Sequence, residues 1–299
     1  MRHSVLRVAA LALAAAGPLA AQMPGMSDVH DMHHAAKPAS AKARRQIDTV
    51  AKSVASLETT AAAGAAGFRP RFGWIPTMGT HWVSVQKMMN GRQTDRSAPS
   101  QLMFSKINGR DSLVGAAYAY MTADNDTVRP SLFDGNPPWH DHPDLAPAGL
   151  DLVMLHVWFV PSPDGPFAGT NPNLPFWALG LAAPDSVRMR DPAFKAMVMR
   201  ASLALGELAD STSILPTLKE RDDDVGPAIA ARRDSVRVLI PEFIAAQKTH
   251  DAVRWERTAT KAAAQWDGMQ ATYLASARTP AGRERIQKFI ATILGQHGE

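Results

Sequence analysis

The stretch "NPPWHDHPD" at residues 136–144 holds two histidines, His140 and His142, separated by one residue. On an extended backbone, residues i and i+2 point to the same side and lie about 7 Å apart. Two imidazoles at that spacing can converge on one metal ion, at N–metal distances of about 2.0–2.1 Å. Prolines on both sides restrict the backbone and lower the entropy lost when the rings are held together. The stretch therefore predicts a metal site, with a solvated polar turn as the alternative.

Two other histidines of the same region are candidates for a third ligand. His156 lies in "VMLHVWFV" (153–160), whose residues are apolar on both faces, so we expect a central strand and a buried ring. A buried imidazole must find a hydrogen-bond partner or a metal. His81 opens the next candidate, "HWVSV" (81–85). Either ring would complete a three-nitrogen site with an open position, which can bind or activate water. Asp141 and Asp144 either orient the rings or form the turn.

The composition limits which metal such a site can hold. The chain has no cysteine, so disulfides, thiol catalysis and thiolate ligands are excluded. Imidazole ligands indicate copper or zinc. A second cluster of soft ligands, which suits copper, lies near the N-terminus: Met23, Met26, His30, Met32, His33 and His34. For that cluster, a flexible linker without metal is the favoured interpretation, because short biased tracts are weak evidence.

The elements that must position these residues change in character along the chain. Residues 42–63 have helical apolar spacing. Short β-rich segments then follow at 81–85, 101–105, 112–120 and 153–160, and "NGRD" (108–111) indicates a hairpin turn. From about residue 190 the period is helical again, with Asp191 as an N-cap. We therefore expect an α+β protein: a small antiparallel β-barrel or sandwich, preceded by one helix and followed by a C-terminal set of helices.

The first residues predict export. A basic start, "MRHSVLR", precedes the apolar run "VAALALAAAGPLA", which is shorter than the 20 or so residues that span a bilayer. This order is typical of a secretory signal peptide, with cleavage expected after Ala21. The predicted organisation is a signal peptide (1–21), a flexible Met/His-rich linker (22–40), a helix plus β core (41–180), and a helical region packed on that core (181–299). The expected location is the periplasm or outside the cell.

Charge gives little indication of a macromolecular partner. Loss of Arg2 and Arg7 with the leader lowers the formal charge from +4 to +2. No stripe of basic and aromatic residues is present, so we expect no nucleic-acid partner. We also expect no transmembrane segment in the mature chain. The expected partner is a metal ion or a small molecule, and the oligomeric state is left open.

Six short motifs occur in order over about 110 residues of the middle region: "GF" (67–68), "PTMGTHW" (76–82), "LVGAAY" (113–118), "PSLFDG" (130–135), "LHVWF" (155–159) and "GPFAGTNP" (165–172). Together they resemble a family of exported bacterial proteins with no assigned activity. The resemblance implies an exported protein with a β core, and no chemistry. One position departs from the family pattern: Ala117 stands where the family carries a glutamate.

Three functions remain open on these grounds. The first is binding of copper or zinc through His81, His140, His142 and His156. The second is a carrier that encloses a small apolar ligand among the aromatic residues of the β core: Trp82, Phe104, Trp158 and Phe159. The third is a metal-dependent enzyme of unknown reaction, against which Ala117 argues mildly. Convergence of the four histidines favours a metal, and scattered histidines around an apolar cavity favour a carrier.

Overall fold

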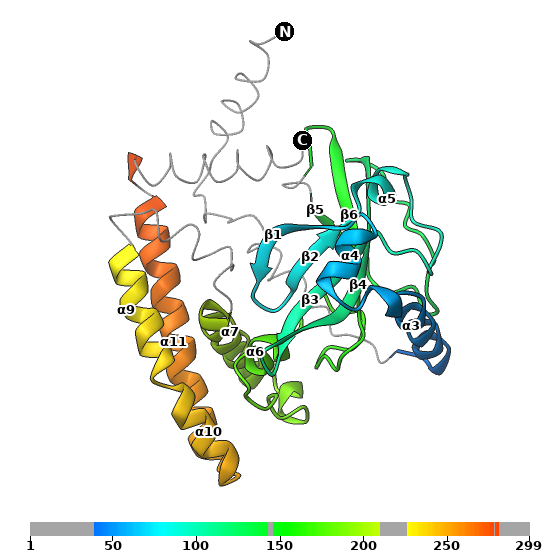
Figure 1. The fold of residues 1–299 in the computed structure, drawn as a ribbon. Helices are drawn as coiled ribbons and strands as arrows, with labels where there is room; N and C mark the ends of the chain where they lie inside the picture. Colours follow the sequence, from blue (N-terminus) through cyan, green and yellow to red (C-terminus); the bar gives the residue numbers. More distant parts are fainter. Residues whose placement is uncertain (1–38, 143–145, 210–225, 278, 281–299) are drawn as a thin grey trace.

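The computed structural model describes residues 39–142, 146–209, 226–277 and 279–280. The predicted signal peptide, almost all of the predicted linker with its Met/His cluster, Asp144 and residues 281–299 of the predicted helical region lie outside these residues. The described chain has the predicted α+β architecture. An antiparallel sheet is preceded in the chain by helices and followed by a C-terminal set of helices (Figure 1).

Among the described residues, six strands form the sheet, in the order β1-β2-β3-β4-β6-β5. They are β1 (Arg69–Ile75), β2 (Gly79–Val83), β3 (Gln101–Ile107), β4 (Arg110–Ala123), β5 (His140–His142) and β6 (Leu150–Trp158). All described pairs are antiparallel. The predicted hairpin turn joins β3 to β4, with Asn108 at φ 50 and Gly109 at φ 77, the positive values that a tight two-residue turn requires.

The prediction of a barrel or sandwich is not confirmed. The described strands make one open sheet, with β1 and β5 at its two edges. The physical reason lies in what covers the sheet. Helices cover one face, and a loop with a short helix covers part of the other, so the apolar residues of both faces are buried without closure or a second sheet.

The N-terminal helix packs on one face of this sheet. Helix α3 (Ala41–Ser53) begins at Ser40, whose Oγ accepts a hydrogen bond from the Ala43 N–H at 3.0 Å. Its buried residues Ile47 and Val50 pack in one cluster with side chains of β4 and β6. The predicted helix over 42–63 is broken: a 3₁₀ turn (Ala55–Leu57) follows α3, and Thr59 then caps α4 (Thr60–Ala65).

Two short helices lie beside the other face. Helix α5 (Val85–Met89) follows β2, and α6 (Asn173–Ala178) follows the loop after β6. Leu174 of α6 and Ala168 of that loop pack against Met103 and Trp158. The Trp158 indole N–H also donates to the Ala168 carbonyl at 2.6 Å. The loop and α6 therefore cover part of the face that carries the histidines.

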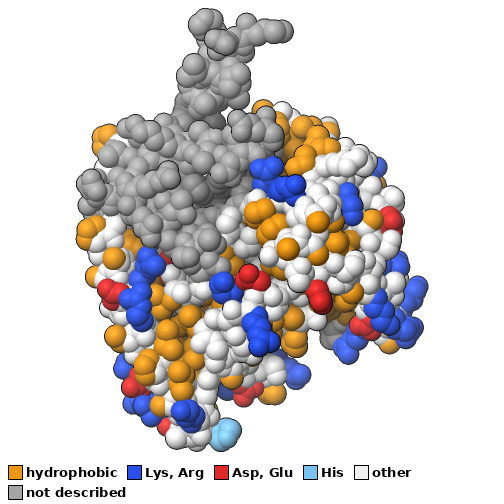
Figure 2. Space-filling model, in the orientation of Figure 1, with side chains coloured by type: hydrophobic (Ala, Val, Ile, Leu, Met, Phe, Trp, Pro, Cys, Tyr) orange, Lys and Arg blue, Asp and Glu red, His pale blue; other side chains and the backbone are white. Residues whose placement is uncertain are grey.

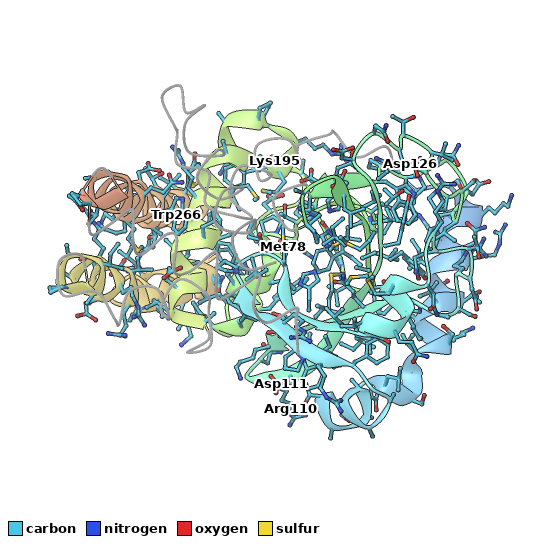
Figure 3. The ribbon with its side chains drawn as sticks, turned by 90° about the horizontal axis from the view of Figure 1, so that it is seen from above. Met78, Arg110, Asp111, Asp126, Lys195 and Trp266 are labelled. Carbon is cyan, nitrogen blue, oxygen red and sulfur yellow. The ribbon has the colours of Figure 1, made fainter. Side chains whose placement is uncertain are left out.

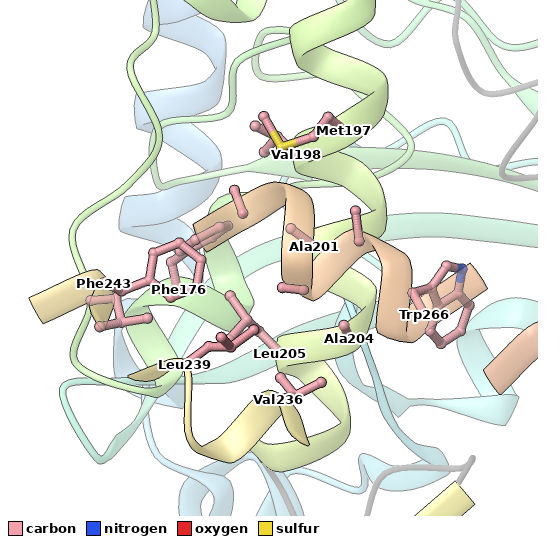
Figure 4. Packing of buried hydrophobic residues seen from close by; sticks show 14 of the residues in the cluster. Phe176, Met197, Val198, Ala201, Ala204, Leu205, Val236, Leu239, Phe243 and Trp266 are labelled. Carbon is pink, nitrogen blue, oxygen red and sulfur yellow. The ribbon is translucent and has the colours of Figure 1, made fainter. Parts of the chain in front are cut away.

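The C-terminal helices have their own core. They are α7 (Pro192–Ala209), α9 (Gly226–Arg237), α10 (Ile240–Lys248) and α11 (Ala252–Ala277), after a 3₁₀ turn at Arg188–Arg190. Buried side chains of all four helices meet there, including Val198, Leu205, Val236, Phe243 and Trp266 (Figure 4). Asp191 caps α7 as predicted, accepting from the Ala193 N–H at 2.8 Å.

Helix α7 joins this helical region to the sheet. Its Gly206 lies against Pro76 of the β1–β2 turn: a Cβ atom there would sit 2.6 Å from the Pro76 Cβ. Ser202 Oγ donates to the Pro172 carbonyl at 2.7 Å, and Lys195 Nζ lies 2.6 Å from Asp164 Oδ1. Seen from above, Met78 of the same turn lies between the sheet and helix α11, which carries Trp266 (Figure 3). The predicted division at residues 180/181 stays a prediction.

On the face shown in Figure 2, the side chains of Lys and Arg are interspersed with those of Asp and Glu. Within the described ranges, no helix combines the length and apolar character needed to cross a membrane.

At the first residue of β2, one substitution is expected to have a large effect on stability. Gly79 has φ 76, and a Cβ atom there would lie 2.3 Å from the Phe104 carbonyl oxygen. Gly67 has φ 89 with nothing within 4 Å of the same virtual atom. We expect Gly67→Ala to cost about 1 kcal/mol through backbone strain alone, and Gly79→Ala to cost about 3 kcal/mol or more because the clash is added. Urea unfolding of both variants checks this; equal losses would contradict it.

Candidate functional site

The four candidate histidines come from three strands and reach one face of the sheet. The register shows that this face is shared. His81 pairs with Met103, which pairs with Gly115 of β4, and His156 pairs with Ala117, two residues further along β4 on the same face. At the edge of the sheet His140 pairs with Met154. The predicted extended backbone of the His140–Asp141–His142 stretch is confirmed as strand β5. Alternation along that strand then places both of its rings on the face that carries His156.

The four rings form one cluster. Nε2 of His81 lies 3.3 Å from Nε2 of His156. The centroid of the His156 ring is 5.4 Å from that of His81 and 4.9 Å from that of His140. The rings of His140 and His142 are 4.8 Å apart. We define these four residues as the histidine cluster.

The cluster is largely buried. His156, His81 and His142 are 1%, 5% and 7% exposed, while His140 is partly exposed. Burial lowers the pKa of His81 from 6.5 to about 4, with a smaller contribution from His142. Burial also lowers the pKa of His156 well below its ordinary value; the neighbouring histidines act in the same direction and the Gly169 backbone opposes them. Both rings are therefore neutral at pH 7, and each keeps a nitrogen lone pair.

Small residues on β4 let the rings meet. Strands β2 and β6 are separated by β3 and β4, which is about 14 Å in a flat sheet. The rings of His81 and His156 must therefore lean toward each other across the two intervening strands. On this face β4 presents Gly115 and Ala117. A Cβ atom on Gly115 would lie 2.6 Å from the Val157 carbonyl oxygen, so there is no space for a side chain at that position.

Contacts on both sides of strand β5 hold its histidines in place. Trp139 packs edge-on against Tyr120, and its indole N–H donates to the Pro130 carbonyl at 3.0 Å. Arg129 Nη2 lies 2.7 Å from Asp141 Oδ1. Asp141 therefore pairs with an arginine, and the structure gives it no hydrogen bond to either ring. Its role as an orienting acceptor stays a prediction.

Two methionines also lie on this face, and sequence reasoning counted neither among the candidate ligands. Met103 and Met154 stand directly across from His81 and His140 in the register. The signal for Met154 was present, since alternation places it on the face of His156. Met103 became a neighbour of His81 only through the pairing of β2 with β3. The aromatic residues proposed for a carrier divide between two clusters: Trp82, Phe104 and Phe159 pack with the N-terminal helices, while Trp158 packs with α6.

Comparison of the chain with known protein families, curated proteins and solved structures found no match. The resemblance to exported bacterial proteins therefore stays a prediction. Ala117, the residue at which the chain departs from the pattern of that family, pairs with His156 and so lies beside the histidine cluster.

The side chains do not already form a finished coordination sphere. Among the described residues, no group of three or more His, Asp or Glu is posed to hold a metal ion. The observation that bears on function is therefore the meeting of four imidazoles, two of them neutral and within contact distance of each other.

Proposed function

We propose that the protein binds one copper or zinc ion through His81, His140, His142 and His156. The observation that carries the proposal is the 3.3 Å separation between Nε2 of His81 and Nε2 of His156. Two nitrogens that each lie about 2.0–2.1 Å from one tetrahedral ion are about 3.3–3.4 Å apart. The pair is thus already at the spacing of two ligands of one metal.

The wider cluster supports the same geometry. The centroid of an imidazole lies roughly 3.2 Å from an ion that its nitrogen binds, so two rings at a tetrahedral angle have centroids about 5 Å apart. The ring separations of 4.8, 4.9 and 5.4 Å lie around that value. Without a metal, the His81–His156 contact is an N–H···N hydrogen bond between two neutral rings.

The neutral state of the buried rings supports metal binding. An imidazole coordinates a metal through its lone pair, so it must be neutral. His81 and His156 meet this requirement at pH 7 because burial lowers the pKa of both. An ion then supplies the positive charge that the buried rings do not carry.

Binding requires the remaining rings to turn, since no group of three is posed for a metal among the described residues. His140 is partly exposed and lies at the edge strand, where such a change disturbs the least packing. Four protein ligands would fill a tetrahedral ion, which favours holding the ion over activating water. The proposal includes export to the periplasm or beyond, which the leader pattern predicts.

The test is equilibrium titration of Zn²⁺ and Cu²⁺ into the full chain, the double variant His140→Ala/His142→Ala, and the control His250→Asn. His250 is exposed, lies far from the cluster in the sequence, and has φ 52, which asparagine tolerates. We expect the control to bind as the parent chain does. We expect the double variant to lose more than about 10-fold in affinity, because a weakened ligand set binds less tightly. Equal binding by all three proteins would refute the proposal.

A further inference from the structure

Two buried methionines flank the histidine cluster. Met103 is 0% exposed and Met154 is 6% exposed. In the register, Met103 stands across from His81, and Met154 stands across from His140. Direct partners on antiparallel strands have Cβ atoms about 4.5–5.5 Å apart. Each end of the cluster thus has a thioether on the neighbouring strand and on the same face.

The side chain of Met103 extends across the sheet, over the neighbouring strand. A Cβ atom on Gly115 of β4 would lie 2.5 Å from the Met103 methyl carbon, so this side chain lies directly over Gly115. Gly115 pairs with Trp158, which is two residues from His156 on the same face. The thioether therefore lies above the same two strands that the rings of His81 and His156 cross to meet.

We infer that this site selects copper in its Cu(I) state, with a thioether of Met103 or Met154 replacing one imidazole in the set of four ligands. The inference rests on the proposed metal-binding function and narrows its metal. Imidazole binds both zinc and copper, whereas thioether sulfur selects Cu(I). Zinc sites use thiolate, imidazole and carboxylate ligands instead.

The experiment measures Cu(I) and Zn²⁺ affinities by competition with chelators, under anaerobic and reducing conditions for Cu(I). The parent protein is the full chain with its N-terminal Met and His residues replaced by serine: Met23, Met26, His30, Met32, His33 and His34. This removes the second cluster of soft ligands. The variants are Met103→Leu, Met154→Leu and both together. The matched control is Met269→Leu, a residue equally buried in the helical core, away from the histidines.

The double variant is expected to lose at least about 10-fold in Cu(I) affinity, as removal of groups around a metal costs about 10–100-fold. Its Zn²⁺ affinity should stay within about threefold of the parent, since zinc does not use thioether. Met269→Leu should leave both affinities unchanged. Equal changes for the two metals, or no change for either, would show that these methionines only pack; the inference would fall and the proposed function would stand. Absence of both Cu(I) and Zn²⁺ binding in the parent would overturn both.

Discussion

Replacing His156 by phenylalanine is expected to reduce metal affinity by more than about 100-fold, since even outer partners of metal ligands cost about 10–100-fold when removed. His156 lies at the centre of the cluster, within ring contact of both His81 and His140. Phenylalanine keeps a flat ring on this buried central strand and removes both nitrogens. The measurement is titration of Zn²⁺, with unfolding curves to show that the variant folds.

The same substitution separates a shared site from independent ones. If His81 and His156 bind one ion, His81→Phe in the His156→Phe background should cost much less than it does alone, because the site is already broken. Additive losses would indicate two separate sites and contradict the proposal. The His250→Asn variant again serves as the control, since it changes an exposed histidine only.

Acid is expected to destabilise the metal-free protein well before its carboxylates are protonated. Burial lowers the pKa of His81 from 6.5 to about 4. Between these two values the unfolded chain binds a proton at this ring and the folded chain does not, so lowering the pH favours unfolding. The stability contributed by the neutral ring is complete above pH 6.5 and declines as the pH falls toward 4. The loss across this window is about 3 kcal/mol for His81, and His156 adds to it in the same direction.

Urea unfolding in the presence of EDTA at pH 7, 6 and 5 measures this slope. His81→Phe should reduce this slope, because the variant keeps only His156 of the two rings whose pKa burial lowers, while His250→Asn should leave the slope unchanged. Saturating metal at pH 7 should raise stability; at 100 times its Kd an ion adds about 2.7 kcal/mol. Equal slopes for the parent chain and His81→Phe would contradict the account of the buried ring.

Local patterns in the sequence predicted much of the fold. The alternation around His156 indicated a central strand and a buried ring, and both are confirmed: β6 lies between β4 and β5, and His156 is 1% exposed. Asn108-Gly109 predicted the hairpin, and Asp191 predicted the start of α7. Each of these depends on interactions within a few residues, where steric and hydrogen-bonding preferences decide the structure.

Long-range features were less accessible. Strand β1 carries Pro70 and Gly73 and a register shift between Arg71 and Trp74, which hide it as a strand. The prediction of a barrel or sandwich failed because closure of a sheet depends on which strands become its edges, and no local sequence pattern indicates that. The candidate site was partly predictable: the His140/His142 spacing indicated two convergent rings. Contact between His81 and His156 required the strand order and the small residues at 115 and 117, which only the assembled sheet brings together.

The central claim is that one ion is held by this cluster, and the most direct measurement is a crystal structure of the metal-loaded full chain with anomalous scattering at the absorption edge of the metal. The account predicts one peak about 2.0–2.1 Å from Nε2 of both His81 and His156. We also expect the rings of His140 and His142 to have turned to become the third and fourth ligands. An ion bound only at the N-terminal methionines and histidines, with the His81–His156 pair still in direct hydrogen-bond contact, would contradict it.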